Sequence, residues 1–399
     1  MMKSLSLTCL LMMGVAALAQ QRTKPYFPPR DRWAHRLPQN LGLDPVKIDS
    51  AIAFAKRYES KQPRNMVAAQ RQSFGREPFS EPVGALEDRA DPSGLIIYKG
   101  YVVAEWGNPW RVDITHSVTK SFLSTVVGLA VDRGLIRSVN DTVANYIPPI
   151  EVFHPGGATE VITPFASAHN RMLTWEVMLR QTSDWEGTLW GKPDWADRPQ
   201  GDSSTWRTRA RNNPGTVYKY NDVRVNALAL AATQVWRQPL PQVLKTQIME
   251  PIGASTTWRW MGYNNSWIVL DGVPVQSVSG GGHWGGGMYI HAYDMARFGL
   301  LTLHRGKWEG KQLLSEQWVK QALTPTAANN TYGYMNWFLN TDHKMAAKAP
   351  VTSFIHVGNG TNIIYVDPEH ELVAVVRWIE NRNMGEMIGK ILEALPAQK

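Results

Sequence analysis

Residues 115–134 have the sequence THSVTKSFLSTVVGLAVDRG, and this stretch predicts a buried helix around which the rest of the chain is organised. Residues 122–131 are apolar at most positions and on nearly every side of a helix, which is typical of a central helix rather than a surface one. Gly134 suits the position just after the last helical residue. The polar residues 115–117 would then open the helix.

Ser117 and Lys120 are three positions apart, which places their side chains on one face of a helix, a turn apart. A serine hydroxyl is a weak nucleophile at neutral pH and needs a neighbouring base to take its proton. A lysine amine is such a base only where burial or nearby cations favour its neutral form, and the apolar residues that follow supply the burial. The same residues also fit a plain buried helix whose lysine extends its amine to the surface. The pair alone therefore leaves catalysis and packing open.

The first 19 residues have the pattern of a secretory signal peptide. Lys3 precedes an apolar run over residues 5–18, and the small residues of Ala17-Leu18-Ala19 predict cleavage after Ala19. We therefore expect an exported protein, periplasmic or secreted. No later segment reaches the ~20 apolar residues that a membrane-spanning helix needs, so no integral membrane segment is expected after cleavage. The only cysteine, Cys9, lies inside the signal, which excludes disulfides and thiol catalysis in the mature chain.

The composition indicates a folded globular protein. Of the 399 residues, 43% are hydrophobic and 19% are charged, and the net charge of +8 is modest for this size. No long basic stripe is present, so we expect no nucleic-acid partner. The ten histidines show no His-x-x-x-His or similar spacing, so we expect no metal and no other cofactor. The oligomeric state is left open.

The sequence pattern divides the chain into three parts. Residues 1–19 are the signal, and residues 20–90 form an N-terminal arm with a helix over 44–58 and a long surface loop over 60–92. Residues 91–399 form the main domain. Within it, residues 135–280 are expected to be mostly helical.

Strand patterns lie near both ends of the main domain. Residues 94–107 predict a hairpin around Lys99-Gly100, and residues 354–366 and 372–380 predict a second hairpin joined by residues 367–370. These strands favour an α+β fold with one antiparallel sheet, formed by both ends of the chain and flanked by helices.

Two later stretches carry groups that a serine nucleophile requires. Residues 214–222 (PGTVYKYND) present two tyrosines and Asp222 just before a predicted helix. Residues 354–360 (FIHVGNG) join a strand to glycines, which permit a ligand to approach the backbone closely.

The order of Ser-x-x-Lys, Pro-Gly-Thr with a later tyrosine, and His-x-Gly resembles the serine hydrolases related to class C β-lactamases. That family includes penicillin-binding DD-peptidases, esterases and 6-aminohexanoate-dimer amidases. The resemblance covers residues 90–380 and implies a β-lactamase/transpeptidase-like fold for the main domain. It also implies a small ester, amide or peptide-like substrate.

The resemblance assigns roles to individual residues. Ser117 would form an acyl-enzyme, Lys120 and Tyr220 would act as general base and acid, and the backbone N–H groups of Ser117 and Asn359 would form the oxyanion hole. Tyr218 is a rival for Tyr220, which has the family spacing from Pro214. The remaining positions of the family motifs, predicted to contact substrate, are Asp222, His356 and Gly358.

Two positions depart from the β-lactamase pattern. Asp222 stands where these enzymes usually have asparagine, and its carboxylate would favour a charged Lys120. His356-Val357-Gly358 stands in place of Lys-Thr-Gly, which removes two groups that help to hold a β-lactam carboxylate. We therefore expect esters or amides to be preferred over β-lactams. A DD-peptidase or β-lactamase and a catalytically silent penicillin-binding-like protein are the alternatives.

Overall fold

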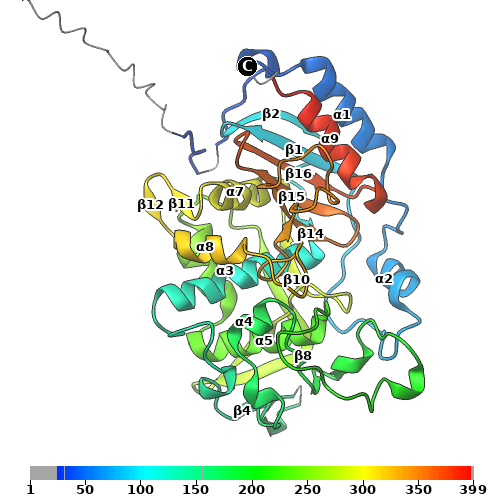
Figure 1. Ribbon diagram of the computed structural model, residues 1–399, viewed down its shortest axis with the longest axis vertical. Coiled ribbons are helices and arrows are strands. Elements are labelled where there is room, and N and C mark those ends of the chain that lie inside the picture. Colours follow the sequence, from blue (N-terminus) through cyan, green and yellow to red (C-terminus); the bar gives the residue numbers. More distant parts are fainter. Residues whose placement is uncertain (1–24, 31, 155, 397–399) are drawn as a thin grey trace, which may run out of the picture.

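The computed structural model describes residues 25–30, 32–154 and 156–396, and the predicted signal peptide lies outside these residues. Its architecture is α+β, as predicted: helices pack on two antiparallel sheets (Figure 1). Among the described residues, no helix combines the length and the hydropathy needed to cross a bilayer.

The first sheet is formed by both ends of the chain. Its strand order is β13-β14-β15-β16-β1-β2, so strands from the start of the main domain pair with strands from its end. Ser93 pairs with Arg377 and Tyr98 with Leu372 across the central junction. The strands are β1 (Ser93–Tyr98), β2 (Tyr101–Trp106), β13 (Phe338–Leu339), β14 (Phe354–Gly358), β15 (Asn362–Asp367) and β16 (Leu372–Arg377).

The C-terminal strands form a three-stranded meander, which corrects the predicted two-stranded hairpin. Residues 354–366 are not one strand, because the chain turns after Gly358 and pairs β14 with β15. The dipeptide Asn359-Gly360 lies in this turn, and Asn-Gly is a strong hairpin signal. The turn places Asn359 at the end of the sheet.

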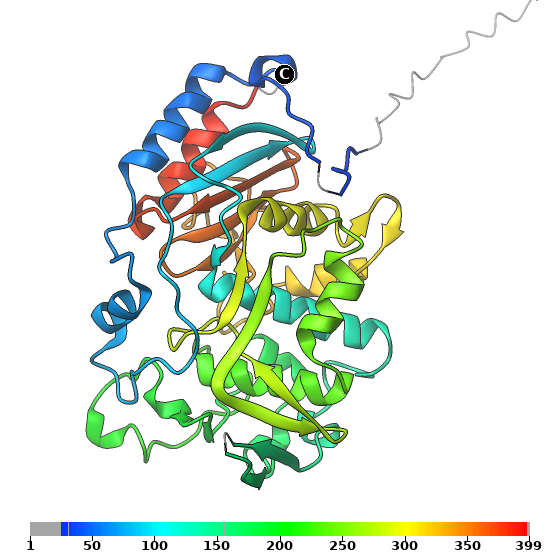
Figure 2. The ribbon, with the colours of Figure 1, turned by 180° about the vertical axis from the view of Figure 1, so that it is seen from behind.

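A second sheet occupies part of the region that was predicted to be mostly helical. Its order is β3-β10-β8-β4-β5, with β9 paired to β8. The long strand β8 curves along one side of the molecule (Figure 2). These strands are β3 (Asp113–Ile114), β4 (Ile150–Phe153), β5 (Thr159–Ile162), β8 (Arg259–Leu270), β9 (Val273–Val278) and β10 (Gly287–Ile290). Two short hairpins complete the strands: β6 (Thr188–Leu189) with β7 (Lys192–Pro193), and β11 (Lys307–Trp308) with β12 (Lys311–Gln312).

Helices cover both faces of the first sheet. The helices α1 (Pro45–Arg57) and α9 (Met384–Glu393) pack together on one face, and α7 (Ala292–Leu303) lies on the other (Figure 1). The central helix α3 (Thr119–Asp132) is buried from Thr119 to Ala130. The helices that pack against it are α5 (Asp222–Trp236), α6 (Leu240–Leu244) and α8 (Glu316–Ala322), and α4 (Trp175–Leu179) packs on α5.

Residues 60–92 contain a helix, α2 (Met66–Phe74), that the sequence analysis missed. The Asn65 side chain caps it by accepting a hydrogen bond from the Ala68 backbone N–H. Met66 and Ala69 are buried with Trp378, so the helix packs against the body of the protein. This segment brings part of the N-terminal region to the site described next.

Candidate active site

Ser117 lies in a short 3-10 turn, His116–Val118, immediately before α3. His116 has a left-handed backbone, with φ of 49°, which is uncommon for a residue other than glycine. The side chain of Thr119 supports this turn by donating a hydrogen bond to the His116 carbonyl oxygen at 2.6 Å. The turn presents Ser117 to a cavity while its neighbours His116 and Val118 stay buried.

The Lys120 ammonium is fully buried beside Ser117. Its Nζ lies 2.9 Å from Ser117 Oγ, 2.7 Å from Asp222 Oδ1 and 3.2 Å from the Gly280 carbonyl oxygen. The amine donates hydrogen bonds to the Ser117 hydroxyl and the Gly280 carbonyl oxygen, and it forms an ion pair with Asp222.

Tyr220 completes the group that meets at Ser117. Its ring centroid lies 4.9 Å from Lys120 Nζ, and its hydroxyl donates to Asn336 Oδ1 at 3.3 Å. Burial and the Asp222 charge raise the pKa of Tyr220 above its ordinary value, while a hydrogen bond from Ser117 lowers it. The rival Tyr218 lines the same cavity, but its ring packs on Tyr332.

Asn336 holds the Tyr220 hydroxyl and was not identified from the sequence. It has a left-handed backbone, with φ of 65°, in the segment before β13. Its side-chain amide donates to the Val357 carbonyl oxygen at 2.6 Å, which ties it to β14. Asparagine tolerates this backbone conformation well, but the sequence alone does not show which loop asparagine meets Tyr220.

Asp222 faces the buried side of Lys120 and does not line the cavity, which corrects its predicted contact with substrate. Its Oδ2 atom lies 2.9 Å from Arg198 Nη1 and 3.1 Å from His283 Nδ1. Burial acts to raise the pKa of Asp222, but Arg198, Lys120 and His283 together hold it well below its ordinary value. Asp222 is therefore a buried carboxylate that pairs with Lys120, as the sequence analysis expected.

Gly358 allows β14 to touch the turn that carries Ser117. A Cβ atom at this position would lie 1.9 Å from the Thr115 carbonyl oxygen and 3.1 Å from the Ser117 nitrogen, so no larger residue fits. The next residue, Asn359, lines the same cavity as Ser117, and its side chain accepts a hydrogen bond from Gln62 at 3.0 Å. The structure thus brings the predicted oxyanion-hole residue to the nucleophile.

His356 lies in the core, which corrects its predicted contact with substrate. Its side chain is fully buried among the rings of Trp337, Phe298 and Phe354, at centroid distances of 4.8, 5.4 and 5.5 Å. Burial lowers the pKa of His356 to about 3, so the ring is neutral. The residue fills the space between β14 and α7 rather than facing the cavity.

The cavity beside Ser117 has a volume of about 540 Å³ and is lined mostly by uncharged groups. The N-terminal region contributes Ser60, Gln62 and Phe74 to its wall, although the sequence analysis assigned these residues to a surface loop. Among the described lining residues, Arg198 and Glu380 are charged. The Arg198 guanidinium already pairs with two buried aspartates.

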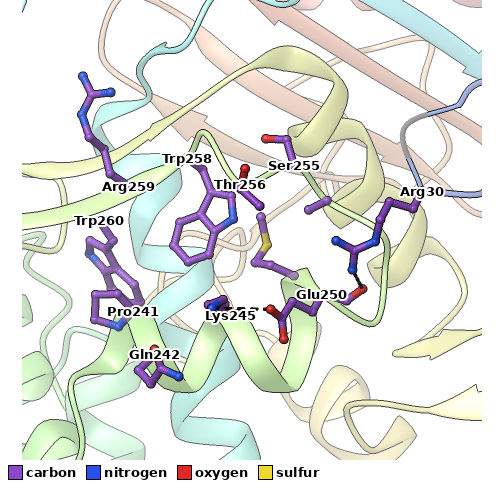
Figure 3. A pocket seen from close by; sticks show the side chains of 12 residues that line it. Arg30, Pro241, Gln242, Lys245, Glu250, Ser255, Thr256, Trp258, Arg259 and Trp260 are labelled. Carbon is purple, nitrogen blue, oxygen red and sulfur yellow. Dashed lines mark hydrogen bonds and ion pairs between the residues drawn. The ribbon is translucent and has the colours of Figure 1, made fainter.

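A second cavity of about 450 Å³ lies apart from these residues, between α6 with the π-helical turn Lys245–Met249 and the start of β8. Trp258 and Trp260 face it, and Lys245 and Glu250 form an ion pair of 3.6 Å on the helical wall (Figure 3). None of the predicted site residues lines it. The chemistry of Ser117 therefore belongs to the first cavity.

Comparisons with known proteins agree with this architecture. A family model described as Beta-lactamase matches residues 97–389. Similar solved structures include a penicillin-binding protein homologue from Caulobacter crescentus (14% identity, 89% of this chain and 99% of that chain, TM-score 0.56) and a family VIII carboxylesterase (16%, 88% and 96%, TM-score 0.54). A β-lactamase from Mycobacterium bovis is also similar (18%, 76% and 95%, TM-score 0.51). At these identities the structural likeness shows a shared fold.

Proposed function

Because the chain belongs to the β-lactamase family, we propose that it is an exported serine hydrolase that cleaves a small ester or amide through an acyl-enzyme on Ser117. The observation that carries this proposal is the 2.9 Å contact between Lys120 Nζ and Ser117 Oγ at the edge of an open cavity. A buried lysine beside a serine hydroxyl is the arrangement that activates a nucleophile in this way. The predicted signal peptide, residues 1–19, supports export.

The reaction proceeds in two steps. In the first, Ser117 Oγ bonds to the acyl carbon of the substrate while its proton passes to the Lys120–Tyr220 pair. The bond to the alcohol or amine then breaks, and that leaving group takes the proton. In the second step, water gives a proton to the same pair and its oxygen attacks the acyl carbon, which releases the acid and restores Ser117. The backbone N–H groups of Ser117 and Asn359 bind the oxyanion in both steps.

The protonation of Lys120 and Tyr220 decides whether either group can accept the Ser117 proton. Lys120 donates to Ser117 while the adjacent Asp222 carboxylate favours its ammonium form, and Tyr220 has a raised pKa, so neither group takes a proton from Ser117 in this arrangement. One proton must first leave the Lys120–Tyr220 pair. The activity is therefore expected to rise with pH until this pair has lost that proton.

The cavity favours substrates without a carboxylate next to the scissile bond. Arg198 is the cation among its described lining residues, and Asp197 and Asp222 already neutralise it. A β-lactam carboxylate would find no free positive charge there, so its desolvation would be uncompensated. The similarity to a carboxylesterase structure is consistent with an ester substrate.

The proposal is tested with Ser117→Ala and a matched control, Ser124→Ala, which removes a buried hydroxyl on α3 that has no hydrogen-bond partner among the described residues. We expect Ser117→Ala to abolish p-nitrophenyl ester hydrolysis and labelling by a fluorophosphonate, while Ser124→Ala keeps both. Ester turnover by Ser117→Ala would refute the acyl-enzyme. A wild-type protein that no fluorophosphonate labels would favour a silent binding protein, and nitrocefin turnover equal to that of the best ester would favour a β-lactamase.

Export is tested on the full chain in a bacterial host. The exported protein should begin at Gln20, and N-terminal sequencing of the periplasmic or secreted fraction measures this directly. Retention of the unprocessed chain in the cytoplasm would contradict the proposal.

A further inference from the structure

A row of buried charged groups leads away from Lys120 on the side opposite Ser117. Asp222 bridges Lys120 and His283, and His283 Nε2 lies 3.0 Å from Glu77 Oε2. The four groups come from α3, α5, the loop between β9 and β10, and the segment after α2. Gly282 allows that loop to approach, because a Cβ atom there would lie 2.6 Å from Asp222 Cγ.

His283 has the surroundings of an imidazolium. Its Nδ1 atom forms a hydrogen bond with Asp222 Oδ2 at 3.1 Å, and its Nε2 atom lies within ion-pair distance of Glu77 Oε2 at 3.0 Å, so a carboxylate lies beside each ring nitrogen and favours the charged ring. Phe74 stacks on the ring at a centroid distance of 4.3 Å and shields it from solvent. Burial alone would lower the pKa of His283, but its hydrogen bonds to Asp222 and Glu77 raise it above its ordinary value.

The other titratable groups around His283 are Asp197, Arg198, Lys120 and His116. Asp197 faces it at 3.9 Å from the segment that precedes Arg198, and the Arg198 guanidinium shares the same Asp222 oxygen. Lys120 contacts the other oxygen of Asp222, and His116 is the remaining titratable neighbour. The burial of His116 lowers its own pKa to about 3, so it brings no charge near neutral pH.

We propose that Glu77 and His283 are positioning residues. Glu77 keeps His283 charged, and the charged His283 competes with Lys120 for the Asp222 carboxylate, which makes it easier for Lys120 to lose a proton. This inference rests on the proposed function of Ser117. A cation on Asp222 Oδ2 competes with Lys120 for the carboxylate and repels the ammonium through a poorly screened interior. Glu77 keeps that cation charged. Without it, Asp222 pairs more strongly with the Lys120 ammonium.

The same atoms argue against a metal ion in this place. Glu77, Asp197 and His283 offer ligand atoms within 4.8 Å of one another, which the sequence analysis did not foresee because the three residues are far apart in the chain. Both His283 nitrogens already face carboxylates, however, and Arg198 neutralises Asp197 at 2.5 Å. A cation from the protein itself fills the role that an added ion would have.

The experiment compares the pH dependence of kcat/KM for p-nitrophenyl acetate in the full-length mature enzyme and its variants. We expect His283→Gln to move the acid limb to higher pH by about one unit, which is about a tenfold loss on the acid side, with little change at the alkaline plateau. Glu77→Gln should shift it in the same direction by a smaller amount. Glu81→Gln is the matched control, because Glu81 lies on the same segment but is exposed and pairs with Arg71.

The outcomes separate this inference from the function it rests on. An unshifted acid limb in both variants, or an equal loss of kcat/KM at every pH, would overturn the positioning role while Ser117→Ala stays inactive. Hydrolysis that survives Ser117→Ala would instead overturn the proposed function and this inference with it. If His283→Gln does not fold by circular dichroism, Glu77→Gln against Glu81→Gln decides the matter.

Discussion

Asp222 Oδ1 lies 2.7 Å from Lys120 Nζ, and Asp222 is the residue that departs from the asparagine of the β-lactamase pattern described above. A carboxylate at this distance stabilises the ammonium form of Lys120, which cannot accept a proton from Ser117. Arg198 and His283 contact the other oxygen of Asp222 and weaken this stabilisation.

Asp222→Asn is expected to move the acid limb of kcat/KM to lower pH, because the ammonium form of Lys120 loses its partner. The same change leaves Arg198 and His283 with less compensation, so we expect a loss of stability of about 3–5 kcal/mol, as for a broken buried ion pair. Ester hydrolysis from pH 5 to 9 and urea unfolding measure the two effects. An acid limb that moves to higher pH would contradict this account.

Gly358→Ala is expected to reduce kcat by at least about 100-fold, the scale of a lost oxyanion-hole donor. The added methyl group would overlap the Thr115 carbonyl oxygen and push β14 away from the Ser117 turn. The measurement is ester hydrolysis, with circular dichroism to confirm folding. Gly389→Ala serves as the control, because this glycine of α9 has an ordinary helical backbone and its Cβ would meet only the Lys348 side chain, at 3.4 Å. Equal activity in the two variants would show that close approach at Gly358 is not required.

Asn336→Gly is expected to lower kcat by about 10–100-fold with little change in KM, the usual scale for a lost proton-transfer contribution. The variant keeps the left-handed backbone but removes the amide that holds the Tyr220 hydroxyl. Asn340→Ala is the matched control: among the described residues, that buried side chain bonds only backbone groups of the loop over residues 346–350, so the change should lower stability and spare kcat. Unchanged kcat in Asn336→Gly would remove Asn336 from the site.

These residues show where sequence reasoning succeeds and where it stops. Short local motifs predicted the pairing of the two chain ends, which the structure confirms, because each motif lies on one element whose type its pattern reveals. The same motifs selected Ser117, Lys120, Tyr220 and Asn359, whose catalytic roles stay predictions. Asn336 and the residues of the N-terminal wall reach the cavity through tertiary packing, for which no local signal exists.

The second sheet was missed for a related reason. The polar residues Tyr263 to Ser266 interrupt β8 where its pairing with β9 shifts register, so the run does not alternate cleanly along its length. His356 shows the converse case. The motif located it correctly on a strand, but only the packing of Phe298 against that strand shows that the ring turns into the core.

His356→Phe is expected to make the protein less sensitive to acid. The pKa of this buried ring is about 3 in the folded protein against an ordinary value of 6.5, so the unfolded chain binds the proton first as pH falls. His356 therefore lowers the free energy of unfolding little above about pH 6.5, and it lowers it progressively more as the pH falls to about 3. Between pH 7 and pH 5 the buried histidine costs about 2 kcal/mol, which phenylalanine does not. Urea unfolding at the two pH values measures the difference.

His116, whose pKa is also about 3, still contributes the same kind of loss in the variant, so the acid sensitivity should be reduced rather than removed. An identical fall in stability for wild type and variant would show that His356 is protonated, or solvated, in the folded protein.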